Sequence, residues 1–127
     1  MRPIKFRAWD TKRKKMFSAE EMGRDQLTLS TDGRGFINVH GTSTRLSTFL
    51  THLIPEQFTG IRDKSGKEIY ANDTMQSKDG LRKYVVTWNK AQGYWYLNGL
   101  GGPWAVNTPM WEDYEVIGTI HDEEAKE

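Results

Sequence analysis

The chain has 127 residues, which is enough for one domain, or two small lobes, with a real hydrophobic core. Its 18 Lys and Arg residues nearly balance its 17 Asp and Glu residues, so the net charge of +1 excludes an overall field that would attract a polyanion. The lack of cysteine excludes disulfides and cysteine-ligated zinc, and no apolar run approaches the roughly 20 residues that span a bilayer. We therefore expect a soluble, cytoplasmic protein that does not engage a membrane.

The first residues have the pattern of a β-hairpin followed by a short helix. Alternating apolar and polar side chains predict a strand over residues 4–9, which pairs through a strongly basic turn with residues 16–17. Ser18 and Glu21 have the spacing of a capping box, and this spacing predicts a short helix. We expect the helix to end at Gly23, because glycine so soon after the cap is a common stop.

A second hairpin and a second helix are predicted before the middle of the chain. Residues 27–29 and 36–39 favour strands and flank an Asp-Gly turn, which indicates a hairpin. Apolar side chains recur at helical spacing over residues 42–54, and Pro55 ends the run, so a helix is expected there. The Thr and Ser content of this stretch would also suit a strand.

The middle of the chain carries the clearest turn signal. Asp63, Lys64, Ser65 and Gly66 form a polar run between apolar residues, and Gly66 can take the positive φ that a hairpin turn with a bulge needs. We expect Asp63 and Gly66, and Asp73 further on, to have structural roles in turns.

Short strands with glycine-containing turns dominate the second half. Strands are predicted over residues 84–88, 94–97 and 114–120, and residues 97–111, rich in Gly and Pro, are expected to form a long loop. This spacing favours a small, strongly bent sheet or barrel of the SH3-like kind.

The predicted fold class is therefore mainly β, a β-rich α+β fold. We divide the chain into an N-terminal lobe of hairpins and short helices at residues 1–55, an SH3-like β-lobe at 56–121 and a polar tail at 122–127.

Three blocks of the sequence resemble the signature blocks of the YopX family. In the family's order, they are residues 4–10 (IKFRAWD), 57–70 (QFTGIRDKSGKEIY) and 114–118 (YEVIG). The resemblance implies a small β-rich protein encoded by a bacteriophage or prophage, in the cytoplasm of an infected or lysogenic bacterium, and it implies no established activity. Relatives commonly have Glu-Gly-Asp-Ile after the middle block. This chain keeps the aspartate as Asp73 and replaces the glycine by Asn72, which also tolerates a left-handed backbone.

The sequence carries no recognisable catalytic or metal-binding motif. His40, His52 and His121 are its only histidines, and none has a second ligand at the close spacing typical of metal sites. It contains no Gly-x-Ser-x-Gly elbow, and its glycines match no phosphate-binding fingerprint. We therefore expect no enzyme activity, no metal and no cofactor. An enzyme without a recognisable motif is the least favoured alternative.

The aromatic residues of the second half favour a function in recognition. Alternation places Tyr94 and Tyr96 on one face of their strand and Trp95 on the other, so one single-sided core cannot take every ring. The candidate partner-binding residues are Trp88, Tyr94, Trp95, Tyr96, Trp104, Trp111, Arg82 and Lys83.

Three interpretations of these rings stay open at this point. The favoured hypothesis is a phage-encoded accessory protein that binds another protein or a second copy of itself, since Trp and Tyr are the commonest interface anchors. The first alternative is that the rings stack on unpaired bases of a nucleic acid. The structural alternative is that the glycine-rich loop folds over the rings and buries them.

Overall fold

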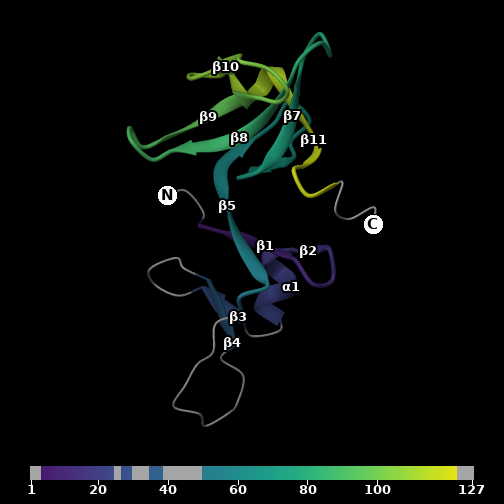
Figure 1. The fold of residues 1–127 in the computed structure, drawn as a ribbon, viewed down its shortest axis with the longest axis vertical. Helices are drawn as coiled ribbons and strands as arrows, with labels where there is room; N and C mark the ends of the chain where they lie inside the picture. The colour runs from purple at the N-terminus through teal and green to yellow at the C-terminus, as the bar shows by residue number, and fades with distance from the viewer. Residues whose placement is uncertain (1–3, 25–26, 30–34, 39–49, 123–127) are drawn as a thin grey trace. The chain divides into compact units, whose positions relative to one another are not determined.

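A computed structural model describes residues 4–24, 27–29, 35–38 and 50–122. The protein is mainly β, as predicted, and its contacts divide it into an N-terminal unit, Lys5–Gln57, and a C-terminal unit that begins at Phe58 (Figure 1). Strand β5 (Leu53–Arg62) contributes to both units: its first half pairs with β1 (Phe6–Asp10) and its second half with β6 (Glu68–Tyr70).

The N-terminal unit is a small antiparallel sheet with a helix and a second hairpin. Strand β1 pairs with β5 on one side and with β2 (Lys15–Phe17) on the other. The helix α1 (Ala19–Arg24) follows, and β3 (Leu27–Leu29) pairs with β4 (Phe36–Asn38), so both predicted hairpins are confirmed. The buried core residues of this unit are Ala8, Met22, Phe36 and Leu53.

The capping box at the start of α1 is confirmed. The Glu21 amide donates to the Ser18 hydroxyl at 3.1 Å, and the Ser18 amide donates to the Glu21 carboxylate at 3.1 Å. We predicted that the helix ends at Gly23, but it continues to Arg24. Gly23 does not take the left-handed conformation that would end the helix there. No helix in the described ranges has the length and apolar character needed to cross a bilayer.

The helix predicted over residues 42–54 is wrong at its C-terminal end. Leu53 and Ile54 belong to β5, where Leu53 pairs with Asp10 and Ile54 with Trp9. Pairing along β1 satisfies the backbone of these residues in a sheet and overrides their helical spacing. Residues 50–52 are not helical either and lead into β5 through a turn, and the remaining part of the predicted helix, residues 42–49, lies outside the described residues.

One cross-strand contact of this unit was not predicted. The Arg7 guanidinium donates to the Glu56 carboxylate at 2.9 Å, and the Glu56 side chain has no exposed surface. The two residues are direct neighbours in the β1–β5 register. Their charges therefore favour this register over one shifted by a residue.

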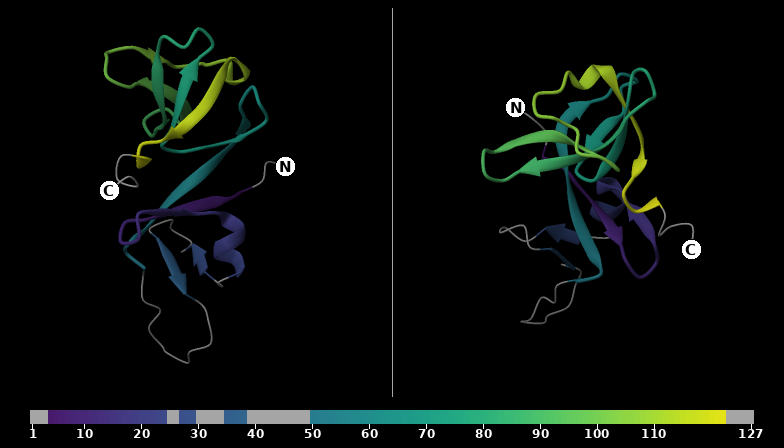
Figure 2. Two further views of the ribbon diagram at one scale, coloured as in Figure 1. Left: turned by 90° about the vertical axis from the view of Figure 1, so that its right-hand side faces the viewer. Right: turned by 45° about the horizontal axis from the view of Figure 1, so that its top comes forward.

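The C-terminal unit contains a five-stranded antiparallel sheet that curls into a half-barrel (Figures 1 and 2). In the order β10-β9-β8-β7-β11, its strands are β10 (Ala105–Val106), β9 (Tyr94–Gly99), β8 (Lys83–Asn89), β7 (Asp73–Ser77) and β11 (Tyr114–Thr119). The predicted long loop over residues 97–111 is shorter, because it contains the end of β9, all of β10 and the first residue of a 3₁₀ helix (Trp111–Asp113).

The concave side of the half-barrel holds the core of this unit. Its buried residues are Ile69, Met75, Tyr84, Val86, Leu97 and Val116. Alternation along β8 turns Tyr84 and Val86 inward, and they pair across the sheet with Gly99 and Leu97.

Short polar turns connect β5 to β6 and β6 to β7. In the β5–β6 turn, the Asp63 carboxylate accepts hydrogen bonds from the amides of Ser65 and Lys67 at 2.9 and 2.8 Å, and Gly66 has a φ of 87°. In the next turn the Asp73 carboxylate accepts from the Tyr70 amide at 2.8 Å, and the intervening Asn72 has a φ of 69°. Both turns therefore combine a carboxylate that accepts backbone N–H groups with a left-handed residue.

Candidate functional site

The pairing of β8 with β9 determines which aromatic rings share a face. Trp88 lies opposite Trp95, while Tyr96 lies opposite Thr87. Because side chains alternate, the two tryptophans lie on the core side of the sheet, and Tyr96 lies on the outer side together with Tyr94. Trp95 and the two tyrosines therefore lie on opposite faces of β9, as the sequence pattern predicts.

Trp88 is the most exposed of the candidate aromatic residues, with 47% of the residue's surface in solvent. Its indole contacts that of Trp95 edge to face, with ring centroids 4.9 Å apart, and Trp95 in turn packs against the core. Tyr94 and Tyr96 are half-buried and also meet edge to face, at 6.4 Å. Trp88 is therefore a partly exposed ring at the edge of the core, and its contact with Trp95 holds it in place.

Trp104 is held by the fold. Its indole N–H donates to the Lys83 carbonyl at 3.2 Å, and its own carbonyl accepts from the Gly99 amide at 2.6 Å. A Cβ atom at Gly99 or Gly102 would collide with Trp104, so these glycines make room for it. The Arg82 guanidinium lies 5.4 Å from the centroid of the same ring. Trp104 and Arg82 thus hold the glycine-rich segment against the half-barrel. Trp111, the last of the candidate rings, is partly buried and also packs against the core.

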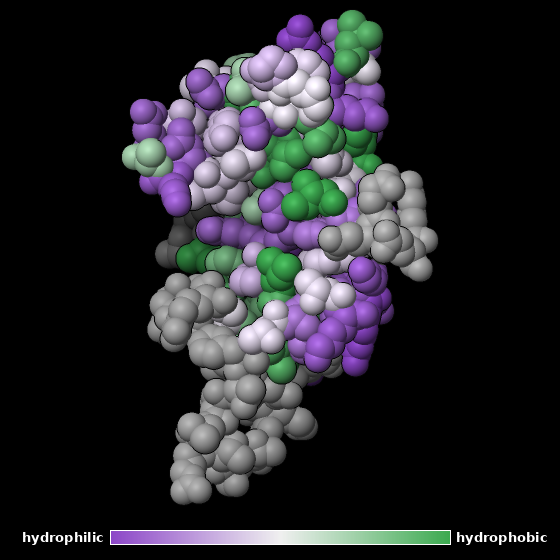
Figure 3. Space-filling view, in the orientation of Figure 1, coloured by the Kyte–Doolittle hydropathy of each residue, from purple (hydrophilic) through white to green (hydrophobic). Residues whose placement is uncertain are grey.

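A hollow of about 390 Å³ opens on the C-terminal unit. Its lining residues are Thr74, Lys83, Leu100, Ile117, Thr119, Ile120 and Asp122. Three of them are exposed aliphatic residues: Leu100 at 45%, Ile117 at 42% and Ile120 at 45%. Hydrophobic residues gather on the face of the C-terminal unit that Figure 3 shows. We call this site the aliphatic hollow.

Of these lining residues, only Lys83 was predicted from the sequence to contact a partner. A signal for Ile117 was available: in the last strand Val116 is buried, so alternation turns the equally apolar Ile117 outward. No sequence pattern brings Leu100 to the same place.

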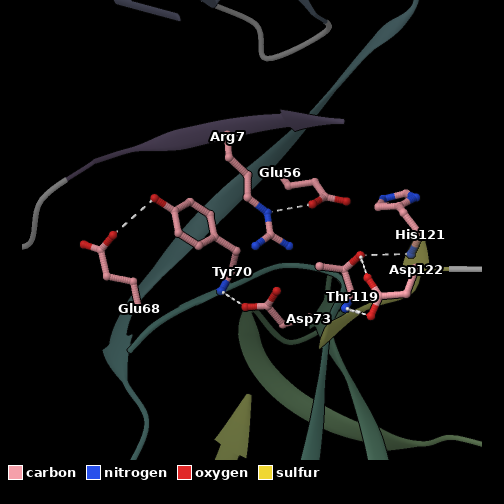
Figure 4. Close-up of polar contacts among 8 residues, drawn as sticks. All are labelled: Arg7, Glu56, Glu68, Tyr70, Asp73, Thr119, His121 and Asp122. Carbon is pink, nitrogen blue, oxygen red and sulfur yellow. Dashed lines mark hydrogen bonds and ion pairs between the residues drawn. The ribbon is translucent and has the colours of Figure 1, made fainter. Parts of the chain in front are cut away.

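Asp122 has a defined position at one side of the aliphatic hollow. Its carboxylate accepts from the Thr119 amide at 3.2 Å and from the Thr119 hydroxyl at 3.4 Å (Figure 4). A Cβ atom at Gly118 would collide with this carboxylate, so the glycine lets it lie against the strand. The Thr119 hydroxyl also accepts from the His121 amide at 3.0 Å. The turn therefore fixes a negative charge next to exposed aliphatic side chains.

A second hollow of about 390 Å³ is more polar. It is lined by Ser77, Lys78, Asp79, Asp113 and Tyr114. Burial raises the pKa of the Tyr114 hydroxyl above its ordinary value, and the Tyr84 phenol and the two carboxylates raise it further. In the part of the chain that the structure describes, no three His, Asp or Glu side chains are grouped in a way that could hold a metal ion.

Comparisons with known proteins identify a family and a shared fold. A family model described as YopX protein matches residues 5–125. The chain is 21% identical to protein EF1440 from Enterococcus faecalis, with a TM-score of 0.63 over 98% of this chain and 97% of that one. It is 17% identical to protein yopX from Bacillus subtilis, with a TM-score of 0.53 over 96% and 95%. At these identities the likeness establishes the fold alone. None of the curated proteins compared matches the chain.

Proposed function

The chain belongs to the YopX family, as three blocks of its sequence predict, and we propose that it is a non-enzymatic module that binds a protein, either a different chain or a second copy of itself. The binding surface in this proposal is the aliphatic hollow. On family membership alone, we also propose a bacteriophage or prophage origin and a role in the cytoplasm of the bacterial host.

The observation that carries the proposal is the gathering of Leu100, Ile117 and Ile120 around one hollow. Single exposed aliphatic residues are normal on a protein surface, whereas apolar side chains grouped within a polar rim mark interaction sites. Leu100 directly follows β9, Ile117 lies within β11 and Ile120 directly follows it, and each residue leaves more than 40% of its surface in solvent.

The polar groups around the aliphatic hollow fit recognition of a protein surface. Lys83 is the first residue of β8, and the Asp122 carboxylate is bonded to Thr119 at the end of β11. One cation and one anion beside an apolar centre is the usual composition of a small interface, in which charges fix orientation and aliphatic contacts supply affinity.

The test is a capture experiment with matched variants. Tagged wild-type protein, Ile117→Asp and Leu81→Asp are each used to capture proteins from cells that carry the gene and also express an untagged copy. Leu81 is 81% exposed and lies outside the hollow, so its substitution introduces the same charge elsewhere. All three proteins are first compared by thermal unfolding.

We expect wild type and Leu81→Asp to retain the same protein, and Ile117→Asp to lose it. Equal retention by all three, or retention of no protein by the wild type, would contradict the proposal.

Single-stranded nucleic acid is a second candidate ligand, favoured by Trp88. Its half-exposed indole rests on Trp95, and the exposed Lys90 follows on the connecting loop. Bases stack on such rings at about 1–3 kcal/mol each. An oligonucleotide that quenches tryptophan fluorescence at low salt in the wild type, but not in Trp88→Ala, would support this function. A signal that is the same in both proteins would remove it.

A further inference from the structure

We propose that the aliphatic hollow binds the aliphatic hollow of a second copy of this chain, in a dimer with two-fold symmetry. This inference rests on the proposed function and names the partner. It follows from where the two charged residues lie relative to the aliphatic ones.

The cation and the anion of the hollow come from the ends of two strands that are not neighbours in the sheet. Lys83 begins β8, whereas Asp122 follows β11 and lies against Gly118 of that strand. The order β8-β7-β11 puts β7, which contributes Thr74, between them. Two strand spacings correspond to roughly 10 Å. The hollow therefore has a positive side and a negative side.

Such a surface is complementary to itself. A two-fold rotation through the centre brings the positive side of one copy onto the negative side of the other, and the reverse contact forms at the same time. Lys83 of each copy then faces Asp122 of the other, and the exposed aliphatic side chains meet between the two pairs. A surface with one sign of charge would repel its own copy.

Both charges are available for this contact. Neither Lys83 nor Asp122 has an ion-pair partner among the described residues, and both residues are exposed. The bonds from Thr119 already orient the Asp122 carboxylate, which lowers the cost of ordering it on binding. The net charge of +1 gives two copies little reason to repel each other at long range.

Sedimentation equilibrium at low salt, from micromolar to millimolar protein, tests the inference. The wild type should approach twice its mass of 14.7 kDa as concentration rises. Lys83→Asp and Asp122→Lys should each raise the dimer dissociation constant by about tenfold or more, because each change puts two like-charged pairs into the interface. Lys90→Asp makes the same charge change on the exposed β8–β9 loop and should leave the constant unchanged.

The symmetry makes a sharper prediction. Lys83→Asp mixed with Asp122→Lys should form a mixed dimer, since each contact then joins opposite charges, and the double variant should dimerise like the wild type. Because Asp122 also binds Thr119, Asp122→Lys can lose its fold. In that event two comparisons of the dimer dissociation constant test the inference. The first compares Lys83→Asp with Lys90→Asp, and the second compares Ile120→Asp with Leu81→Asp. We expect Ile120→Asp to weaken the dimer by about a hundredfold.

A wild type that stays monomeric at millimolar concentration overturns the inference, as does an equal effect of Lys83→Asp and Lys90→Asp. These results are separable from the proposed function. If the chain is monomeric but captures another protein that Ile117→Asp loses, the self-recognition inference fails while the binding function stands. If it is monomeric and captures no protein, both fail.

Discussion

The carboxylate of Asp63 accepts a hydrogen bond from the backbone amide of Val116 at 2.9 Å, across 53 positions of sequence. The neighbouring Lys64 amide donates to the Tyr114 carbonyl at 3.2 Å. Strand β11 is the last strand of its sheet, so these two bonds cover part of an edge that would otherwise be open. The β5–β6 turn, which lies in the longest of the three sequence blocks, thus holds β11 in place, and β11 contributes Ile117 and Thr119 to the aliphatic hollow.

Asp63→Ala should therefore destabilise the protein by about 3 kcal/mol. The substitution removes the carboxylate that accepts from the amides of Ser65, Lys67 and Val116, and the buried Val116 amide loses this acceptor. Urea unfolding measures the loss. Asp79→Ala is the matched control, since the bonds that Asp79 accepts from described residues all lie within its own exposed turn. We expect a much smaller effect there. Equal losses in the two variants would show that the long-range bond contributes nothing.

The same carboxylate should make stability depend on pH. Burial alone would raise the pKa of Asp63, but hydrogen bonds from Val116, Ser65 and Lys67 outweigh it and hold the pKa below its usual value. A carboxyl whose pKa is lower in the folded state stabilises the fold above its unfolded pKa of about 3.9, and this contribution is lost as pH falls through the folded pKa.

The free energy of unfolding of wild type and Asp63→Asn, measured from neutral to acid pH, should differ most above about pH 4 and converge below it. A gap that stays constant across this range would contradict the assigned role of the charge.

Gly118→Ala should damage the aliphatic hollow more than the fold. The added methyl group would displace the Asp122 carboxylate and break its bonds to Thr119, at a cost of about 1 kcal/mol. Gly23→Ala is the control: the site lies in α1, has open space around it and should gain about 0.5–1 kcal/mol. Urea unfolding and the dimer dissociation constant report the two effects separately. Unchanged self-association in Gly118→Ala would argue against a role for Asp122.

Substitution of two tryptophans should destabilise the protein by different amounts. Trp104→Ala removes core contacts and the bond to the Lys83 carbonyl, and should cost about 2–3 kcal/mol of stability. Trp88→Ala removes a half-exposed ring and should cost about 1 kcal/mol or less. Thermal unfolding of both variants makes the comparison. The reverse order would mean that Trp104 does not fasten the glycine-rich segment.

Features set by neighbouring residues were predictable from the sequence. The capping box of Ser18 and Glu21 depends on a spacing of three residues, and the opposite faces of Trp95 and Tyr96 depend only on strand alternation. Leu53 was misassigned to a helix because its pairing with Asp10, far away in sequence, determines its conformation.

The candidate site was less predictable, because it depends on tertiary contacts. Aromatic content selected Trp104, yet the fit of its ring against Gly99 and Gly102 becomes visible only in the folded unit. The aliphatic hollow combines Leu100 with Ile117 across the sheet, and nothing local to either residue indicates the other.

The most direct measurement of the central claim places a photo-crosslinking amino acid at position 120, in the aliphatic hollow, and for comparison at position 81. After irradiation at high protein concentration, we expect efficient crosslinks from position 120 to the same hollow of a second copy, and few from position 81. Crosslinking that is equally weak at both positions, both with the purified protein and in cells that carry the gene, would contradict the claim that this hollow is a protein-binding surface.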